Sequence, residues 1–182
     1  MDNGGKLIKE YKINASTVAV LPILYGNRIF SKIFDLGKGA ISPFKPMDIV
    51  KESCMNNGST YEGRKMAARR FIGTVHKVPI AISPLIYLFP TTSPENPHCI
   101  WIAYDHVIDY KKGELNCMTI VEFSNNQLIP IPISPSSFKN QLVRTMMLKT
   151  KLSKMTSVEH SNSIYTSEAG IQLSAENQQK YY

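Results

Sequence analysis

Residues 57–71, NGSTYEGRKMAARRF, join a turn to a helix and place four cations within seven positions. Gly58 predicts the turn. Ser59, followed three positions later by Glu62, predicts a capping box in which each side chain satisfies an amide that the helix start leaves free. Gly73 predicts the end of the helix. The stretch therefore predicts a short helix that is rich in positive charge.

This helix, over about 60–72, has an apolar side and a basic side on a helical wheel. The apolar side holds Tyr61, Ala68, Phe71 and Ile72, and the other side holds Lys65 and Arg69 with Arg70 beyond them. Such a helix suits a position between a core and a polyanion. Arg64 falls among the apolar positions, so we expect it to pair with an internal carboxylate or a helix terminus. The alternative, in which the other cations are simply solvated, stays open.

Gly58 and Gly63 have the spacing of a phosphate-binding loop, in which a lysine and then a hydroxyl follow the second glycine. Here Arg64 intrudes before Lys65, and Met66 stands where the hydroxyl is needed. The preceding residues, KESCMNN, also indicate a helix rather than the strand that such a loop follows. We therefore do not predict a nucleotide-binding site.

The segments on both sides of this helix decide the fold class. Upstream, residues 13–34 predict a hairpin with its turn at YGN, and MDIVKESCM predicts a short helix. Downstream, apolar runs predict further strands, and LIPIPI predicts an edge strand because its two prolines cannot donate to a ladder. Pro135, at a first helical position, opens a last helix that runs to about Met155. We predict an α+β fold with a β-rich core of antiparallel hairpins, two short helices in the N-terminal half, a longer basic C-terminal helix and a flexible tail.

The last helix places Phe138, Leu142 and Met146 on one face and has a second, partly apolar face beside its cations. Two such faces indicate packing on the same domain and on something else, such as a second subunit. Ordinary core packing, with lysines that lay their apolar stems on the surface, explains the pattern equally well.

Length and composition fit one folded domain, because 182 residues with 43% hydrophobic side chains can bury a substantial core. We predict that this folded domain spans residues 1–155. Residues 156–182 are rich in Ser, Asn, Gln and Glu and predict a polar, flexible C-terminal tail.

The net charge of +7 arises from two blocks without any acidic residue, and it favours a polyanionic partner. The first block lies between Glu62 and Glu95 and holds Arg64, Lys65, Arg69, Arg70 and Lys77. The second lies between Glu122 and Glu159 and holds Lys139, Arg144, Lys149, Lys151 and Lys154. The rest of the chain has a small negative net charge, so the positive charge is concentrated in these blocks.

Other function classes find little support. The start, MDNGGKLIKEYK, has no apolar core of a secretion signal, and the three cysteines lack a CxxC pair, so we expect a reducing, cytoplasmic location. Apolar runs such as IAISPLIYLF are shorter than the roughly 20 residues of a membrane span. The sequence contains neither a G-x-S-x-G nor an H-E-x-x-H motif, so neither of these catalytic signatures indicates an enzyme. His98, Cys99, His106 and Cys117 have no common zinc spacing, and we predict no metal and no cofactor.

Five strings carry a resemblance to a known family. They are TVAVLP (17–22), SKI (31–33), SCMNNGSTYEGRK (53–65), YLFPT (87–91) and SFKNQLVRTMMLKTK (137–151). In order and spacing they resemble the competence transcription factors of the ComK family of Gram-positive bacteria. The resemblance covers about residues 10–152, and G-S-x-Y-x-G-R-K is its most specific motif.

The resemblance implies a cytoplasmic, nucleoid-associated activator of genes for DNA uptake. It implies binding of double-stranded DNA at paired A-tract and T-tract boxes, chiefly through the minor groove, by dimers that associate into tetramers. It also implies delivery to a Clp protease by an adaptor of the MecA type, and RNA polymerase is a further candidate partner. The tail after Lys154 does not resemble the family's adaptor-binding segment, so the resemblance supports DNA binding more directly than this degradation.

The candidate DNA-binding residues come from the matched motifs, the wheel and the charge blocks, and they are Lys65, Arg69, Arg70, Lys77, Arg144, Lys149 and Lys151. Structural roles in the basic motif are expected for Gly58, Ser59, Glu62, Gly63 and Arg64. Two alternatives stay open. The first is a helix-turn-helix that reads the major groove, and the second is a basic protein-interaction module that does not bind DNA specifically.

Overall fold

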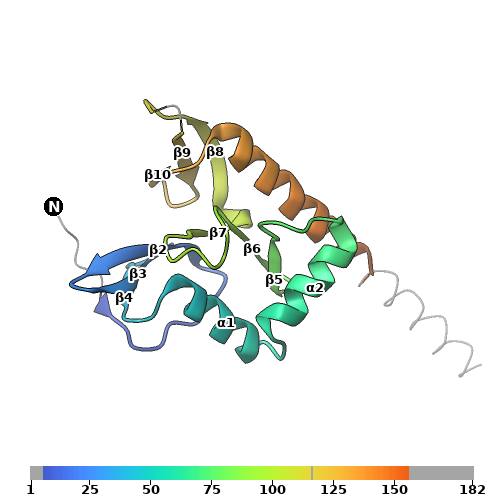
Figure 1. Ribbon diagram of the computed structural model, residues 1–182, viewed down its shortest axis with the longest axis horizontal. Coiled ribbons are helices and arrows are strands. Elements are labelled where there is room, and N and C mark those ends of the chain that lie inside the picture. The colour runs from blue at the N-terminus through green and yellow to red at the C-terminus, as the bar shows by residue number, and fades with distance from the viewer. Residues whose placement is uncertain (1–5, 116, 156–182) are drawn as a thin grey trace, which may run out of the picture. The chain divides into compact units, whose positions relative to one another are not determined.

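The structure is a computed structural model that describes residues 6–115 and 117–155. The chain divides into two units, Met1–Lys149 and Thr150–Tyr182. The predicted tail, 156–182, lies outside the described residues. Strands and helices both contribute to the first unit, which confirms the predicted α+β class (Figure 1).

The larger sheet of the first unit has seven strands in the order β1-β4-β3-β2-β7-β6-β5. Only the short pair β1–β4 is parallel, and all other neighbours are antiparallel. The strands are β1 (Lys6–Leu7), β2 (Thr17–Tyr25), β3 (Arg28–Asp35), β4 (Ala40–Ser42), β5 (Ile80–Ser83), β6 (Ile86–Pro90) and β7 (Trp101–Ala103). The hairpin predicted over residues 13–34 is confirmed as β2–β3. Of its two turn residues, Gly26 adopts a positive φ of 58° and Asn27 does not.

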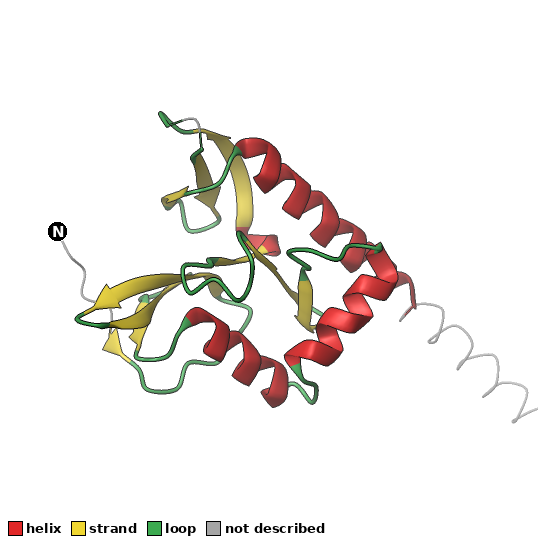
Figure 2. Ribbon diagram, in the orientation of Figure 1, coloured by secondary structure: helices red, strands yellow, loops and turns green. Residues whose placement is uncertain are grey.

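Two helices, α1 (Pro46–Asn56) and α2 (Tyr61–Ile72), pack with the larger sheet around the first hydrophobic core. Pro46 occupies the first turn of α1, where its missing amide costs no hydrogen bond. Trp101 is a fully buried member of this core, and Tyr61 meets it edge to face with ring centroids 6.0 Å apart. In Figure 2 the helices lie at the outer side of the strands and not between them.

The second sheet has three antiparallel strands in the order β10-β9-β8, with bounds Leu128–Ile131, Thr119–Phe123 and Val107–Lys112. A 3₁₀ turn, η1 (Tyr104–His106), connects β7 to β8. The edge strand predicted for LIPIPI is confirmed as β10, which pairs with β9 alone in this sheet. Ile129 and Ile131 are buried and Pro130 is exposed, and an edge strand tolerates prolines because one of its two sides has no partner strand.

The last helix covers residues 135–155, and its part up to Lys149 belongs to the first unit. Its buried face differs from the predicted one: Phe138, Gln141, Thr145 and Leu148 are buried, whereas Met146 is 48% exposed. The prediction followed apolar residues alone, but the two polar side chains on this face find internal hydrogen-bond partners. Among the described residues, no helix is long and apolar enough to cross a membrane.

Candidate nucleic-acid interface

The helix of the first basic block begins at a different cap from the predicted one. Thr60 is the N-cap of α2, and its hydroxyl accepts a hydrogen bond from the Gly63 amide at 3.0 Å. The Ser59 hydroxyl instead donates to the Thr60 carbonyl, and the Glu62 carboxylate pairs with Lys65 at 3.5 Å. The predicted capping box is therefore wrong. Ser59 and Thr60 both carry a hydroxyl just before the helix. Thr60 is the one that takes the N-cap position, in an extended backbone conformation.

Arg64 has the structural role that its place among apolar positions predicts. One terminal nitrogen, Nη2, donates at 2.7 Å to the carbonyl of Asn57, the C-cap of α1. The other, Nη1, donates at 2.7 Å to the carbonyl of Ala81 in β5. The expected pairing with a helix terminus is confirmed. Gly58, with φ +74°, forms the predicted turn that brings α1 and α2 within reach of this guanidinium.

Lys65, a candidate DNA contact, is largely covered. Its side chain is 16% exposed, and its ammonium lies 5.6 Å from the centroid of the Tyr61 ring and 3.5 Å from the Glu62 carboxylate. Both neighbours attract a cation. Lys65 therefore offers little free surface to a ligand, and its contact with DNA stays a prediction.

The C-terminal end of α2 presents its cations to a loop, residues 73–79. Gly73 ends the helix in a left-handed conformation with φ +66°, as predicted, and its amide bonds back to the Arg69 carbonyl. The half-buried Arg69 side chain donates from Nη2 to the Val75 carbonyl at 2.9 Å. Arg70 is exposed, and among the described residues no hydrogen bond or ion pair occupies its guanidinium. Arg69 thus holds the loop while Arg70 faces solvent.

The last helix binds the same loop from the other side. Gln141, 2% exposed, donates from Nε2 to the Lys77 carbonyl at 3.0 Å and to the Pro90 carbonyl at 2.6 Å. Arg144 donates from Nη1 to the His76 carbonyl at 3.4 Å and to the Gln141 side-chain oxygen at 3.3 Å. Lys77 adopts a positive φ of 49°, so the loop is held in a conformation that a lysine seldom takes.

These contacts bring the two acid-free blocks together within the first unit. We call Arg69, Arg70, Lys77 and Arg144 the basic junction. Three successive carbonyls, of Val75, His76 and Lys77, accept hydrogen bonds from α2 on one side and from the last helix on the other. Figure 1 shows the C-terminal end of α2 beside the last helix at this loop. Arg69 of the first block and Arg144 of the second, 75 positions apart in the chain, therefore bind the same loop, which also contains Lys77.

Lys149 lies in a different environment, although it is a candidate in the same block. Its ammonium forms an ion pair with Asp105 and lies 5.7 Å from the ring centroids of both Tyr87 and Tyr104. Burial raises the pKa of the Tyr87 hydroxyl, and the nearby Lys149 partly offsets this rise. A neutralised, ring-flanked ammonium attracts a phosphate less than a free one does. The role of Lys149 in DNA binding stays a prediction.

Lys151 belongs to the second unit, where the described residues 150–155 are helical. Its side chain is exposed, as are those of Lys139 in the first unit and Lys154 in the second. The contact of Lys151 with DNA stays a prediction.

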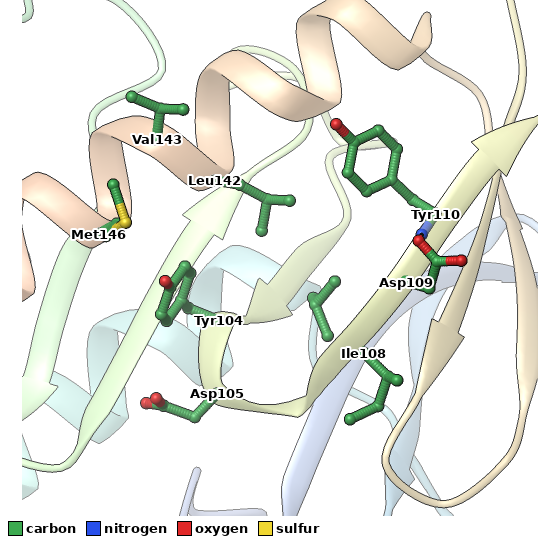
Figure 3. A pocket seen from close by; sticks show the side chains of 9 residues that line it. Tyr104, Asp105, Ile108, Asp109, Tyr110, Leu142, Val143 and Met146 are labelled. Atoms are coloured by element: carbon green, nitrogen blue, oxygen red, sulfur yellow. Dashed lines mark hydrogen bonds between the residues drawn. The ribbon is translucent and has the colours of Figure 1, made fainter.

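A pocket of about 330 Å³ lies between the last helix and the β8 region. Figure 3 shows Leu142 and Met146 on the helix side, opposite Tyr104 and Ile108. The charged groups of its lining are the carboxylates of Asp105 and Asp109, so it does not extend the basic junction. Within residues 6–115 and 117–155, no three His, Cys, Asp or Glu side chains are placed to hold a metal ion.

Gln141 is the functional candidate that the sequence analysis did not find. The hydrophobic pattern offers no reason to select a glutamine whose partners lie 64 and 51 positions away. One signal exists: Gln141 follows the buried Phe138 by three positions and precedes the buried Thr145 by four, which is the spacing of one helix face.

A family model described as ComK protein matches residues 8–157. The chain belongs to the ComK family. It is 40% identical over 146 residues to the competence transcription factor of Bacillus subtilis (strain 168), across 79% of this chain and 76% of that protein. No solved structure matches the chain.

ComK membership assigns the chain to the competence transcription factors, a class of regulators rather than of enzymes. The basic junction and the Arg64 contacts therefore belong to a ComK-family domain. The match to the family model includes both α2 and the described part of the last helix.

Proposed function

We propose that this protein activates competence genes by binding paired A-tract and T-tract boxes, chiefly from the minor groove. Family membership supports the regulatory role, and the basic junction supports the DNA contact. The observation that carries the proposal is the set of three carbonyls in loop 73–79, which bind Arg69 of α2 and Gln141 and Arg144 of the last helix. This loop holds cations of two blocks at one place.

The charge around the junction suits a polyanion. No Asp or Glu occurs in residues 63–94 or 123–158, so the segments that form the junction contain only cations among their charged side chains, histidine aside. Arg70 is exposed, and Lys77 and Arg144 are half-buried. In the proposal these three side chains face the DNA and Arg69 positions the loop. Lys65, Lys149 and Lys151 are secondary contacts.

The geometry of α2 favours the minor groove over a helix-turn-helix. A recognition helix places its N-terminal residues against base edges in the major groove. At that end of α2, Arg64 is bound to two carbonyls, Lys65 is 16% exposed, and the Glu62 carboxylate is 67% exposed. An exposed acid and two occupied cations oppose such a contact. By contrast, arginines at a loop suit the narrow, strongly negative minor groove of an A-tract.

Competition with a minor-groove ligand tests this mode. Prior binding of such a ligand to a duplex with two boxes should displace the protein, because both would occupy the same groove. Methylation that alters only the major groove of the boxes should leave the affinity nearly unchanged. The measurement is fluorescence anisotropy of a labelled duplex, and a duplex in which G·C pairs replace the boxes is the control. Loss of binding on methylation, with no effect of the minor-groove ligand, would support the helix-turn-helix alternative instead.

The remaining family properties complete the proposal. Paired boxes call for at least two subunits, and we propose dimers that associate into tetramers on the chromosome in the cytoplasm. An adaptor of the MecA type, which delivers the protein to a Clp protease, and RNA polymerase are the proposed protein partners. The tail, 156–182, lies outside the described residues and does not resemble the family's adaptor-binding segment, so it is a candidate segment for a partner other than the adaptor.

A further inference from the structure

The β2–β3 hairpin extends beyond the strands that flank it. β2 pairs with β7 only at Ala19 and Val20, and β3 pairs with β4 only from Ser31 to Ile33. Residues 21–30 therefore form a two-stranded ribbon whose outer edges are unpaired among the described residues. Figure 1 shows this ribbon at the end of the first unit that lies away from the C-terminal end of α2.

Large apolar side chains lie exposed at the tip of this ribbon. Leu24 is 73% exposed and Tyr25 is 67% exposed. The Tyr25 ring stacks on Phe30, with centroids 4.9 Å apart and planes 21° from parallel. Tyr25 pairs with Arg28, and Leu24 pairs with Ile29, so the aromatic pair and the arginine share one face while Leu24 projects from the other. Exposed apolar side chains on both faces of one tip fit a surface that binds a partner.

The charge of this segment identifies the kind of partner. No Asp or Glu occurs between Glu10 and Asp35, and the interval holds Lys12, Arg28 and Lys32. Arg28 is exposed, and among the described residues no carboxylate pairs with it. This third acid-free stretch thus carries Arg28 at the tip of the ribbon, on the face of Tyr25 and opposite the face of Leu24. Cations that flank an apolar side chain fit a nucleic acid better than an uncharged protein surface.

We infer that the tip of the β2–β3 hairpin is a second DNA contact, an inference that rests on the proposed function. Arg28 binds the phosphates or the floor of the minor groove, and Leu24 inserts between two adjacent base pairs as an apolar wedge. Two-stranded ribbons and leucine wedges are both established means of binding DNA, and a wedge lets the duplex bend around more protein surface. Such a bend would help one duplex reach both the tip and the basic junction.

Base unstacking is the readout that distinguishes a wedge from simple attraction. The full-length protein is titrated with a two-box duplex that carries 2-aminopurine in a box, and both its fluorescence and its anisotropy are followed. Wild-type protein should raise the fluorescence, because the inserted side chain unstacks the probe. Leu24→Ala should abolish most of this rise and weaken binding by about tenfold, the loss expected for one leucine side chain that is no longer buried. Arg28→Ala should weaken binding and lower the salt slope by about 1.

Leu115→Ala is the matched control, because Leu115 is 65% exposed in the β8–β9 connection but lies beside Glu114. It should bind and unstack like the wild type. Wild-type behaviour of Leu24→Ala, with box-specific binding retained, would overturn this inference alone. A change in the oligomeric state of Leu24→Ala, measured by sedimentation, with its 2-aminopurine signal intact, would also overturn the inference. It would assign the tip to contacts between copies of the chain. If the wild type itself shows no preference for the boxes, the proposed function fails first.

Discussion

Replacing Arg64 with alanine should lower the free energy of unfolding by about 2–4 kcal/mol. The guanidinium donates to the Asn57 carbonyl at the end of α1 and to the Ala81 carbonyl in β5, both at 2.7 Å. Its removal breaks two charge-assisted hydrogen bonds that connect three elements. Urea unfolding followed by circular dichroism measures the change.

Arg70→Ala is the matched control for this experiment. It removes the same side chain from the same helix, but from an exposed position, and should change the stability by about 0.5 kcal/mol or less. Arg64→Lys should recover only part of the loss, because a single ammonium cannot reproduce the forked geometry of the guanidinium. Equal stabilities of Arg64→Ala and Arg70→Ala would contradict a structural role for Arg64.

Replacing Gln141 with leucine should weaken DNA binding by about tenfold, although it removes no charge. This estimate corresponds to one lost bidentate contact, or about 1.4 kcal/mol. Gln141 donates to the Lys77 carbonyl and accepts from Arg144, so its amide fixes both the loop and one cation of the basic junction. Without it the cations remain but their spacing is lost. Affinity is measured by anisotropy at a temperature where the variant is fully folded.

Thr145→Val separates this effect from a general loss of stability. Thr145 is equally buried on the same helix, and its hydroxyl donates to the Gln141 carbonyl within the helix at 2.7 Å without reaching the loop. Both variants should lose about 1–3 kcal/mol of stability, since each breaks buried hydrogen bonds. Only Gln141→Leu should lose DNA affinity. An equal loss for Thr145→Val would contradict the positioning role of Gln141.

Local patterns predicted most of the fold. The β2–β3 hairpin, the edge strand β10 and the end of α2 at Gly73 each depend on residues next to each other in the chain. Two predictions, the cap of α2 and the buried face of the last helix, were wrong. Two consecutive hydroxyls fit the cap of α2, and the buried face of the last helix includes Gln141 and Thr145, whose burial depends on partners that periodicity does not show.

The candidate site was predictable only in parts. Charge counting finds the two acid-free blocks, and the helical wheel explains why Arg64 turns inward. The two blocks meet at loop 73–79 because its carbonyls bind side chains up to 68 positions away in the chain. Composition cannot predict contacts between such distant residues. The pairing of Lys149 with Asp105 is hidden for the same reason.

The central claim is that a single basic surface, assembled from two blocks, binds A/T-rich boxes. The most direct measurement is an anisotropy titration of a two-box duplex and a G·C-substituted duplex of equal length across a salt series. The wild type should prefer the boxes strongly and lose affinity by about a thousandfold between roughly 50 and 200 mM salt, as expected when about six phosphates or more are neutralised. The double variant Arg70→Ala/Lys77→Ala should show a salt slope about 2 units shallower. Equal, weak and salt-insensitive binding of both duplexes would contradict the claim and favour a basic protein-interaction module.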